Sequence, residues 1–213
     1  MYNTILFDLD GTLTDPAEGI TNSVAYALSK FGINITDMSE LYCFIGPPLV
    51  DAFMRFYNFT EEQAKEAVGY YREHFRSVGI LQNEMFDGVP EMLSSLKQQG
   101  KTIALATCKP EPFADVILKH FDIYKYFDFL GGATFDGTRS QKGEVIAYVL
   151  EELKITDKKT VLMIGDRYHD IDGAKENDID SVGVLFGYGD YEELTSSGAT
   201  YIAKTLDDIM KFI

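Results

Sequence analysis

The sequence predicts an α/β fold in which a parallel sheet carries helices on both faces and is interrupted by one inserted all-helical domain. Short apolar runs recur along the chain and are continuous rather than alternating, as in strands that are buried on both faces. Apolar residues with helical spacing lie between most of these runs, and a repeated strand-helix order is typical of parallel sheets. Residues 16 to about 80 contain helical patterns only, which indicates an insertion after the first strand.

The elements of the sheet domain follow one another in a regular order. Strands are predicted at residues 5–7, 102–106, 161–164, 181–185 and 201–203. Helices are predicted at residues 88–99, 111–121 and 143–153, with a closing helix from Leu206. This alternation favours a Rossmann-like core with helices on both faces of the sheet.

The inserted segment is expected to form helices at residues 16–31, 48–57 and 60–78. Thr60 with Gln63 has the signature of a capping box at the start of the last one. A length of 213 residues, at roughly 150 per domain, fits a core with a smaller insertion. We therefore predict an α/β core of residues 1–15 and 81–213 and a helical domain of residues 16–80, with hinges near Asp15 and residues 80–86.

Composition excludes several classes of protein. Hydrophobic residues are 46% and charged residues 25%, as in ordinary globular domains. A net charge of −15 disfavours nucleic acid and anionic membrane surfaces as partners. The two cysteines, Cys43 and Cys108, have no zinc-binding spacing, and no signal peptide or membrane span is recognisable, so a soluble cytoplasmic protein is expected.

Acidic residues follow two of the predicted strands. Asp8 and Asp10 leave the first strand on the same side, where two carboxylates repel each other unless a cation lies between them. A second acidic cluster, which contains Asp166 and Asp170, follows the strand at residues 161–164. Because ligand crevices lie at the carboxyl ends of parallel strands, and oxygen ligands suit magnesium, the sequence predicts a Mg²⁺ site there.

Groups that suit an anion follow the strand at residues 102–106. Thr107, Cys108 and Lys109 offer a hydroxyl, backbone N–H groups and an ammonium at the start of a helix. Lys142, which precedes the helix at residues 143–153, supplies one more cation. Taken alone, Asp10-Gly11 also fits an ordinary hairpin turn, but four such groups at strand ends or helix starts favour a functional site.

Other phosphate-handling motifs fail on the residues themselves. Neither cysteine is followed by arginine at the Cys-x₅-Arg spacing of tyrosine phosphatases, because Ala114 and Leu49 occupy those positions. Residues 137–143 have the lysine before the glycine, which excludes a P-loop. The glycines at 187 and 189 do not complete a dinucleotide-binding pattern, so no nucleotide cofactor is expected.

The order of these groups resembles the four motifs of the haloacid dehalogenase (HAD) superfamily. Residues 8–13, Asp-Leu-Asp-Gly-Thr-Leu, resemble its first motif, and Thr107, Lys142 and residues 165–170 match the other three in order. The helical segment resembles the family's first-type cap. The whole chain is most similar to the branch that contains phosphoglycolate phosphatases, 5′-nucleotidase-like proteins and pyrophosphatases. It departs from that branch at Gly143, where many relatives have proline, and at Cys108, where they have asparagine or serine.

The resemblance implies a Mg²⁺-dependent phosphatase that hydrolyses a small phosphomonoester through an aspartyl-phosphate. The implied catalytic residues are the nucleophile Asp8, the acid/base Asp10, the phosphoryl-binding Thr107 and the charge-stabilising Lys142. The implied metal ligands are Asp8, Asp10, Asp166 and Asp170. The implied substrate-binding residues are Gly11, Thr12, Cys108 and Lys109 in the core and Gly46, Pro47 and Arg55 in the helical domain.

Several alternatives stay open at this level. A sugar phosphomutase or an inorganic pyrophosphatase would use the same core residues, whereas a dehalogenase would need neither the second aspartate nor the metal. A phosphorylation switch without turnover is a remote alternative. Arg55 also fits an ordinary solvated helix charge, and residues 187–189 fit either a plain turn or a loop near the site. We expect a small phosphorylated metabolite as partner and a monomer or homodimer.

Overall fold

The structure is a computed structural model that describes all 213 residues. The chain divides into two compact units, each described by itself: a core unit of Met1–Asp15 with Met85–Ile213, and a helical unit of Pro16–Glu84. The helical unit ends at Glu84, four residues beyond the expected boundary at residue 80. The reason is that the 3₁₀ helix η2 (Gly79–Leu81) packs against the first and last helices of that unit.

The core unit is built on one six-stranded parallel sheet. Its strands are β1 (Thr4–Phe7), β4 (Thr102–Pro110), β5 (Phe129–Ala133), β6 (Val161–Gly165), β7 (Asp180–Val184) and β8 (Tyr201–Ala203), in the order β5-β4-β1-β6-β7-β8. In the middle of the sheet, β1 pairs with β4 on one side and β6 on the other. Chain order therefore reverses at β1, and a crevice outside the carboxyl end of β1 is the expected ligand site of this topology.

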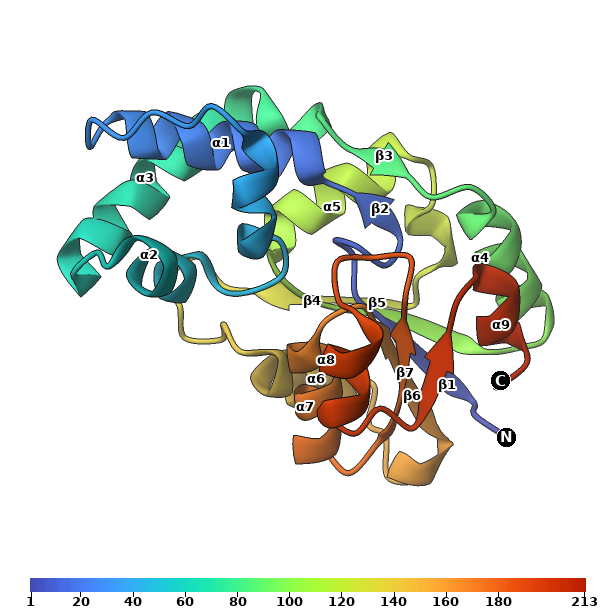
Figure 1. Cartoon of the computed structure of the whole chain (residues 1–213). Helices are drawn as coiled ribbons and strands as arrows, with labels where there is room; N and C mark the ends of the chain where they lie inside the picture. Colours follow the sequence, from blue (N-terminus) through green and yellow to red (C-terminus); the bar gives the residue numbers. More distant parts are fainter. The chain divides into compact units, whose positions relative to one another are not determined.

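Helices cover both faces of this sheet, as the sequence predicts. They are α4 (Val89–Gln98), α5 (Glu111–His120), α6 (Lys142–Glu152), α7 (Tyr168–Glu176), α8 (Tyr191–Ser196) and α9 (Leu206–Met210), with 3₁₀ helices η3 (Tyr124–Tyr126) and η4 (Lys158–Thr160). Parallel crossovers are right-handed, so connections running toward β5 and those running toward β8 lie on opposite faces. Figure 1 shows α6, α7 and α8 grouped on one side of the sheet, and α4 and α9 on the other.

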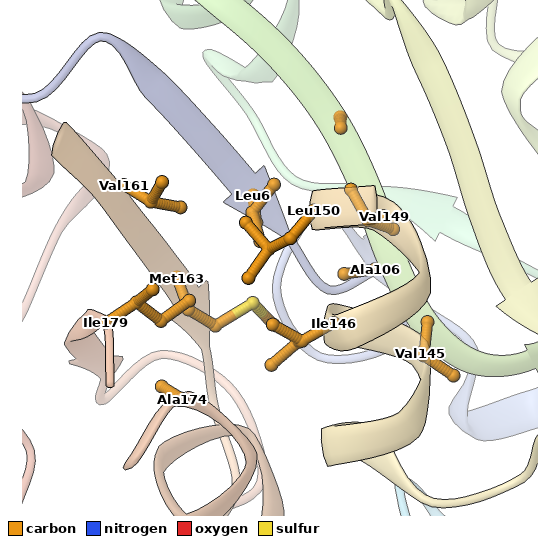
Figure 2. Close-up of a cluster of buried hydrophobic side chains, with 11 residues drawn as sticks. Leu6, Ala106, Val145, Ile146, Val149, Leu150, Val161, Met163, Ala174 and Ile179 are labelled. Atoms are coloured by element: carbon orange, nitrogen blue, oxygen red, sulfur yellow. The ribbon is translucent and has the colours of Figure 1, made fainter. Parts of the chain in front are cut away.

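A cluster of buried apolar side chains joins α6 to the central strands (Figure 2). Leu6 and Met163 from the sheet meet Ile146 and Leu150 from α6, and all four side chains are buried. Helical spacing places these α6 residues on one face, so a single amphipathic helix covers three strands. Figure 2 shows Ala174 of α7 and Ile179 at the edge of the same cluster.

Strand β5 is not among the predicted strands, because its sequence Phe-Leu-Gly-Gly-Ala contains two glycines. Glycine weakens a strand, but it permits a close approach of neighbouring atoms. A Cβ at Gly132 would lie 2.7 Å from the Cα of Glu111, and one at Gly131 would lie 3.0 Å from the carbonyl oxygen of Leu105 and even closer to Val149. The glycines therefore allow α5 and α6 to pack closely on this edge of the sheet.

The helical unit consists of α1 (Ala17–Ser29), the 3₁₀ helix η1 (Met38–Phe44), α2 (Leu49–Tyr57), α3 (Glu61–Ser77) and η2. The predicted capping box is present, since Gln63 N donates to Thr60 Oγ1 at 3.2 Å and Thr60 N donates to Gln63 Oε1 at 3.0 Å. Phe44 and Phe53 pack at 4.9 Å between ring centroids, and Phe53 stacks on Phe59 at 5.8 Å. Aromatic side chains thus supply much of this unit's own core.

The two connections between the units pair with each other as a two-stranded sheet of β2 (Thr14–Asp15) and β3 (Glu84–Met85). Just beyond β3, the backbone N–H of Phe86 donates to the carbonyl oxygen of Leu13 at 3.1 Å. The sequence does not predict either of these two-residue strands. Across the whole chain, no helix has the length and apolar character that a membrane span requires.

Candidate active site

Four buried carboxylates gather at the carboxyl ends of β1 and β6. Asp8 and Asp10 follow β1, Asp166 follows β6, and Asp170 lies in the first turn of α7. Their exposed fractions are 2%, 8%, 0% and 0%. The two strands are neighbours, and the N–H of Asp8 donates to the carbonyl oxygen of Ile164 at 2.9 Å, which explains why groups 158 residues apart in sequence meet.

Lys142, the first residue of α6, lies between two of these carboxylates. Its Nζ is 2.7 Å from Oδ1 of Asp8 and 2.7 Å from Oδ1 of Asp170, and it donates to the carbonyl oxygen of Ala106 at 2.9 Å. Burial opposes its charge, but the Asp170 and Asp8 carboxylates outweigh burial and raise the Lys142 pKa. Burial likewise opposes the charge of Asp170, and Lys142 nevertheless lowers the Asp170 pKa. Lys142 is therefore a permanent cation of the site.

One lysine does not neutralise this cluster. Burial raises the pKa of Asp8 to about 6, despite the opposing effect of Lys142. Burial, followed by the charges of Asp170 and Asp8, also raises the pKa of Asp166 well above its usual value. Oδ1 atoms of Asp8, Asp10 and Asp170 are buried without a hydrogen bond of good geometry, although two of them face Lys142 at ion-pair distance. A divalent cation with oxygen ligands fits this excess of negative charge.

The geometry groups possible metal ligands differently from the sequence prediction. One ligand atom each from Asp8, His169 and Asp170 lie within 4.8 Å of one another. Both ring nitrogens of His169 are buried without a hydrogen-bond partner, and burial lowers its pKa to about 4, so the imidazole is neutral. The carboxylates of Asp10 and Asp166 lie outside this group of three. The sequence predicts only aspartates as metal ligands. The one feature of the sequence that points to His169 as a ligand is its position next to Asp170.

Asp10 forms a buried ion pair with Lys109 of β4. Nζ of Lys109 is 2.5 Å from Oδ2 of Asp10, and the two side chains are only 5% and 11% exposed. The backbone N–H of Lys109 donates to Oγ1 of Thr107 at 3.2 Å, and Thr107 is itself 2% exposed. The Lys109 ammonium, predicted to contact substrate, is thus engaged with Asp10.

Cys108 lies between these residues on β4 and is half-buried. Burial raises the pKa of its thiol to about 12, an effect that Lys142 reduces only in part. The thiol therefore stays protonated and is a poor nucleophile at neutral pH.

A glycine on each side makes room for Asp166. Gly11 has a left-handed backbone (φ 83°), and a Cβ there would overlap the carboxylate of Asp166. Next to it, Oγ1 of Thr12 donates to Oδ1 of Asp166 at 3.4 Å. On the other side, a Cβ at Gly187 would lie 2.5 Å from Oδ2 of Asp166, and the backbone N–H of Tyr188 donates to that oxygen at 2.8 Å. Residues 187–189 therefore lie against the acidic cluster.

The remaining predicted substrate residues belong to the helical unit. Gly46 has a left-handed backbone (φ 105°) and precedes Pro47 in the segment between η1 and α2. Arg55 is exposed on α2, where its guanidinium lies 5.3 Å from the ring centre of Phe56. The contact of these three residues with substrate stays a prediction.

Comparison with known proteins agrees with this arrangement. A family model described as haloacid dehalogenase-like hydrolase matches residues 5–184. A 5′-nucleotidase of Pseudomonas aeruginosa is 46% identical over 205 residues, which cover 96% of this chain and 92% of that protein. The tyrosine-protein kinase PtkA of Mycobacterium tuberculosis H37Rv is 38% identical over 207 residues, which cover 96% of this chain and 70% of that protein.

Solved structures give the same result. A predicted phosphatase from Clostridium acetobutylicum has 48% sequence identity and a TM-score of 0.97, with 100% of this chain and 98% of that chain covered. The predicted fold class, family and hydrolase class are therefore confirmed. On its sequence, its fold and the order of its strand-end residues, the chain belongs to the haloacid dehalogenase-like hydrolase family.

Proposed function

We propose that this protein is a Mg²⁺-dependent phosphatase that hydrolyses a small phosphomonoester, with 5′-nucleotides as the first candidates. The observation that carries the proposal is the buried Asp8–Lys142–Asp170 arrangement, in which the ammonium lies 2.7 Å from each carboxylate. The preference for 5′-nucleotides is supported by the 46% identity to a 5′-nucleotidase. Phosphoglycolate remains a second candidate, since the same core groups would hold any phosphoryl group.

The metal would be held by carboxylate oxygens of this cluster. Buried oxygens of Asp8 and Asp170, which face Lys142 at 2.7 Å, would supply two of the ligands, and Asp166 and Asp10 complete the proposed ligand set. The neutral imidazole of His169 lies close enough to add a nitrogen ligand. When bound, Mg²⁺ supplies positive charge that offsets the carboxylates and orients the phosphoryl oxygens.

In the proposed reaction, a carboxylate oxygen of Asp8 attacks phosphorus. The new oxygen–phosphorus bond forms an aspartyl-phosphate, and the bond from phosphorus to the leaving oxygen breaks. Asp10 must first take up a proton, which it gives to the leaving oxygen; it then takes a proton from a water molecule that attacks phosphorus and releases phosphate, which returns Asp10 to its protonated form. Lys109 holds one oxygen of Asp10, which leaves Oδ1 without a partner and available for these transfers.

The neighbouring groups would hold the phosphoryl oxygens. Oγ1 of Thr107 and backbone N–H groups at the end of β4 would donate to them, while Lys142 would stabilise developing negative charge. Gly11, Thr12 and Cys108 complete the proposed contacts in the core. We further propose that the helical unit acts as a cap, in which Gly46, Pro47 and Arg55 contact the leaving group.

Phosphoryl transfer to a hydroxyl other than water is the alternative that the comparisons favour. A relative that is 38% identical has the name of a tyrosine kinase. Such a transfer uses the same aspartyl-phosphate, but the acceptor that Asp10 deprotonates is then an alcohol or phenol rather than water. A sugar phosphomutase differs from hydrolysis in the same respect, and a pyrophosphatase differs only in its leaving group.

The test is phosphate release from 5′-nucleotides, 2-phosphoglycolate, sugar phosphates and pyrophosphate, with either Mg²⁺ or EDTA. We expect Mg²⁺-dependent release that Asp8→Asn abolishes, because the amide cannot form the intermediate. Asp172→Asn, at a half-buried position of α7, is the matched control and should retain activity. Release that is unaffected by Asp8→Asn would refute the proposal. Label transfer from ATP to a tyrosine peptide, without release to water, would instead support the kinase alternative.

A further inference from the structure

Tyr188 contacts two parts of the core unit that are far apart in sequence. Its backbone N–H donates to Oδ2 of Asp166 at 2.8 Å, and its phenol O–H donates to Oδ1 of Asp15. One contact reaches the acidic cluster, and the other reaches the end of β2. From the sequence, residues 187–189 fit either a plain turn or a loop near the site.

Asp15 occupies a special position in the chain. It is the last residue of the core unit before the helical unit begins at Pro16. It also ends β2, which pairs with β3, the strand through which the chain returns. A side chain that fixes Asp15 therefore fixes the direction in which the chain leaves the core.

Tyr188 itself has little freedom to move. A Cβ at Gly187 would lie 2.5 Å from Oδ2 of Asp166, and one at Gly189 would overlap the carbonyl oxygen of Asp166, so both flanking residues press directly on that aspartate. Gly187 and Gly189 therefore pack closely against Asp166. Interiors packed at this density transmit small shifts rather than absorbing them.

The path from Asp15 back to the nucleophile is equally short. The loop after β1 is closed by hydrogen bonds from Gly11 N to Thr14 O at 2.7 Å and from Thr14 N to Leu9 O at 3.1 Å. Asp15 follows this loop directly. Tyr188 therefore links Asp166 to Asp15, and the loop after β1 connects Asp15 to Asp8.

We propose that Tyr188 is a positioning residue: its hydroxyl sets the direction of the chain at Asp15, and its backbone N–H couples that direction to Asp166. The hydroxyl contact with Asp15 and the backbone contact with Asp166 have separate roles, because only the hydroxyl contact involves the connection to the helical unit. The consequence for substrate turnover rests on the proposed function, but the structural coupling does not.

The first experiment measures amide hydrogen exchange of the metal-free protein in residues 14–15 and 84–86. Tyr188→Phe keeps the ring and the N–H and removes only the hydroxyl. Hydrogen bonds to charged groups are strong enough that exchange there should rise about tenfold or more, while exchange in α6 stays unchanged. Tyr191→Phe, an exposed tyrosine three residues away, is the matched control and should have no effect. Unchanged exchange in Tyr188→Phe would overturn the proposal.

The second experiment tests the pair directly. Asp15→Ala should raise exchange at least as much as Tyr188→Phe, and adding Tyr188→Phe to Asp15→Ala should cause no further rise, because the hydrogen bond between the two side chains is already lost. Independent, multiplicative effects would overturn the coupling.

For turnover, Tyr188→Phe should raise KM for 5′-nucleotides several-fold with acetyl phosphate hydrolysis unchanged. If the wild type releases no phosphate at all, the proposed function fails, whereas the exchange result still decides the role of Tyr188.

Discussion

Replacing Lys142 with methionine is the sharpest test of how the acidic cluster is held together. The ammonium is 1% exposed and lies 2.7 Å from carboxylates that are 3% and 0% exposed. Methionine nearly preserves the length and apolar stem but leaves Asp8 and Asp170 buried without their cation. Removal of one partner from a buried ion pair typically destabilises a protein by about 3–5 kcal/mol. We expect a loss of that size in metal-free protein at about pH 8.

The loss should also depend on pH. Without Lys142, the pKa values of both carboxyls rise above those of the unfolded chain, so the folded state binds more protons than the unfolded state. Stability then falls as pH rises, and the loss should be smaller at about pH 5 than at about pH 8. Urea denaturation followed by circular dichroism measures it, since the chain contains no tryptophan. Lys158→Met, which disrupts an exposed pair at 3.7 Å, should change stability by less than about 1 kcal/mol. A similarly small change in Lys142→Met at about pH 8 would refute the reasoning.

Three further predictions follow from the site and the helical unit. Because burial raises the pKa of Asp8 to about 6 and also raises that of Asp166, protons compete with Mg²⁺, so the increase in unfolding temperature with Mg²⁺ should be larger at about pH 7.5 than at about pH 5.5. Gly187→Ala should weaken Mg²⁺ affinity about 10–100-fold by calorimetry while the circular dichroism spectrum is retained, because the new methyl group displaces Asp166. Thr60→Ala should destabilise the helical unit by about 1 kcal/mol in urea denaturation through loss of the α3 cap, whereas Thr60→Ser should not.

The parts of the fold that follow from local pattern were predictable. The apolar runs of β1, β4 and β6 and the spacing of α4, α5 and α6 carry strong periodic signals, and the structure places these elements within a few residues of the predictions. Helices α7 and α8 were not predicted. The first begins inside an acidic cluster that dominates its composition, and the second has only six residues.

The site was predictable in its residues but not in its pairings. Parallel-sheet topology explains why Asp8 and Asp166 meet, because the neighbouring strands β1 and β6 end at one edge of the sheet. Lys142 reaches them from the first residue of α6. Which cation pairs with which carboxylate depends on side-chain rotamers, so the engagement of Lys109 with Asp10 could not be seen in the sequence. The same holds for Tyr188, whose hydroxyl meets Asp15 across 173 residues of chain.

The central position of β1 also bears on how the protein is made. β1 is synthesised well before the residues with which it pairs, which include Thr102 of β4 and Val161 of β6. The helical unit is complete once Glu84 has been added, and residues 16–84 form a compact unit by themselves. Domains generally fold as units during synthesis, and long-range pairing is slow. The nascent chain should therefore contain a folded helical unit at a stage when the apolar strand β1 is still unpaired, because β4 and β6 have not yet been synthesised.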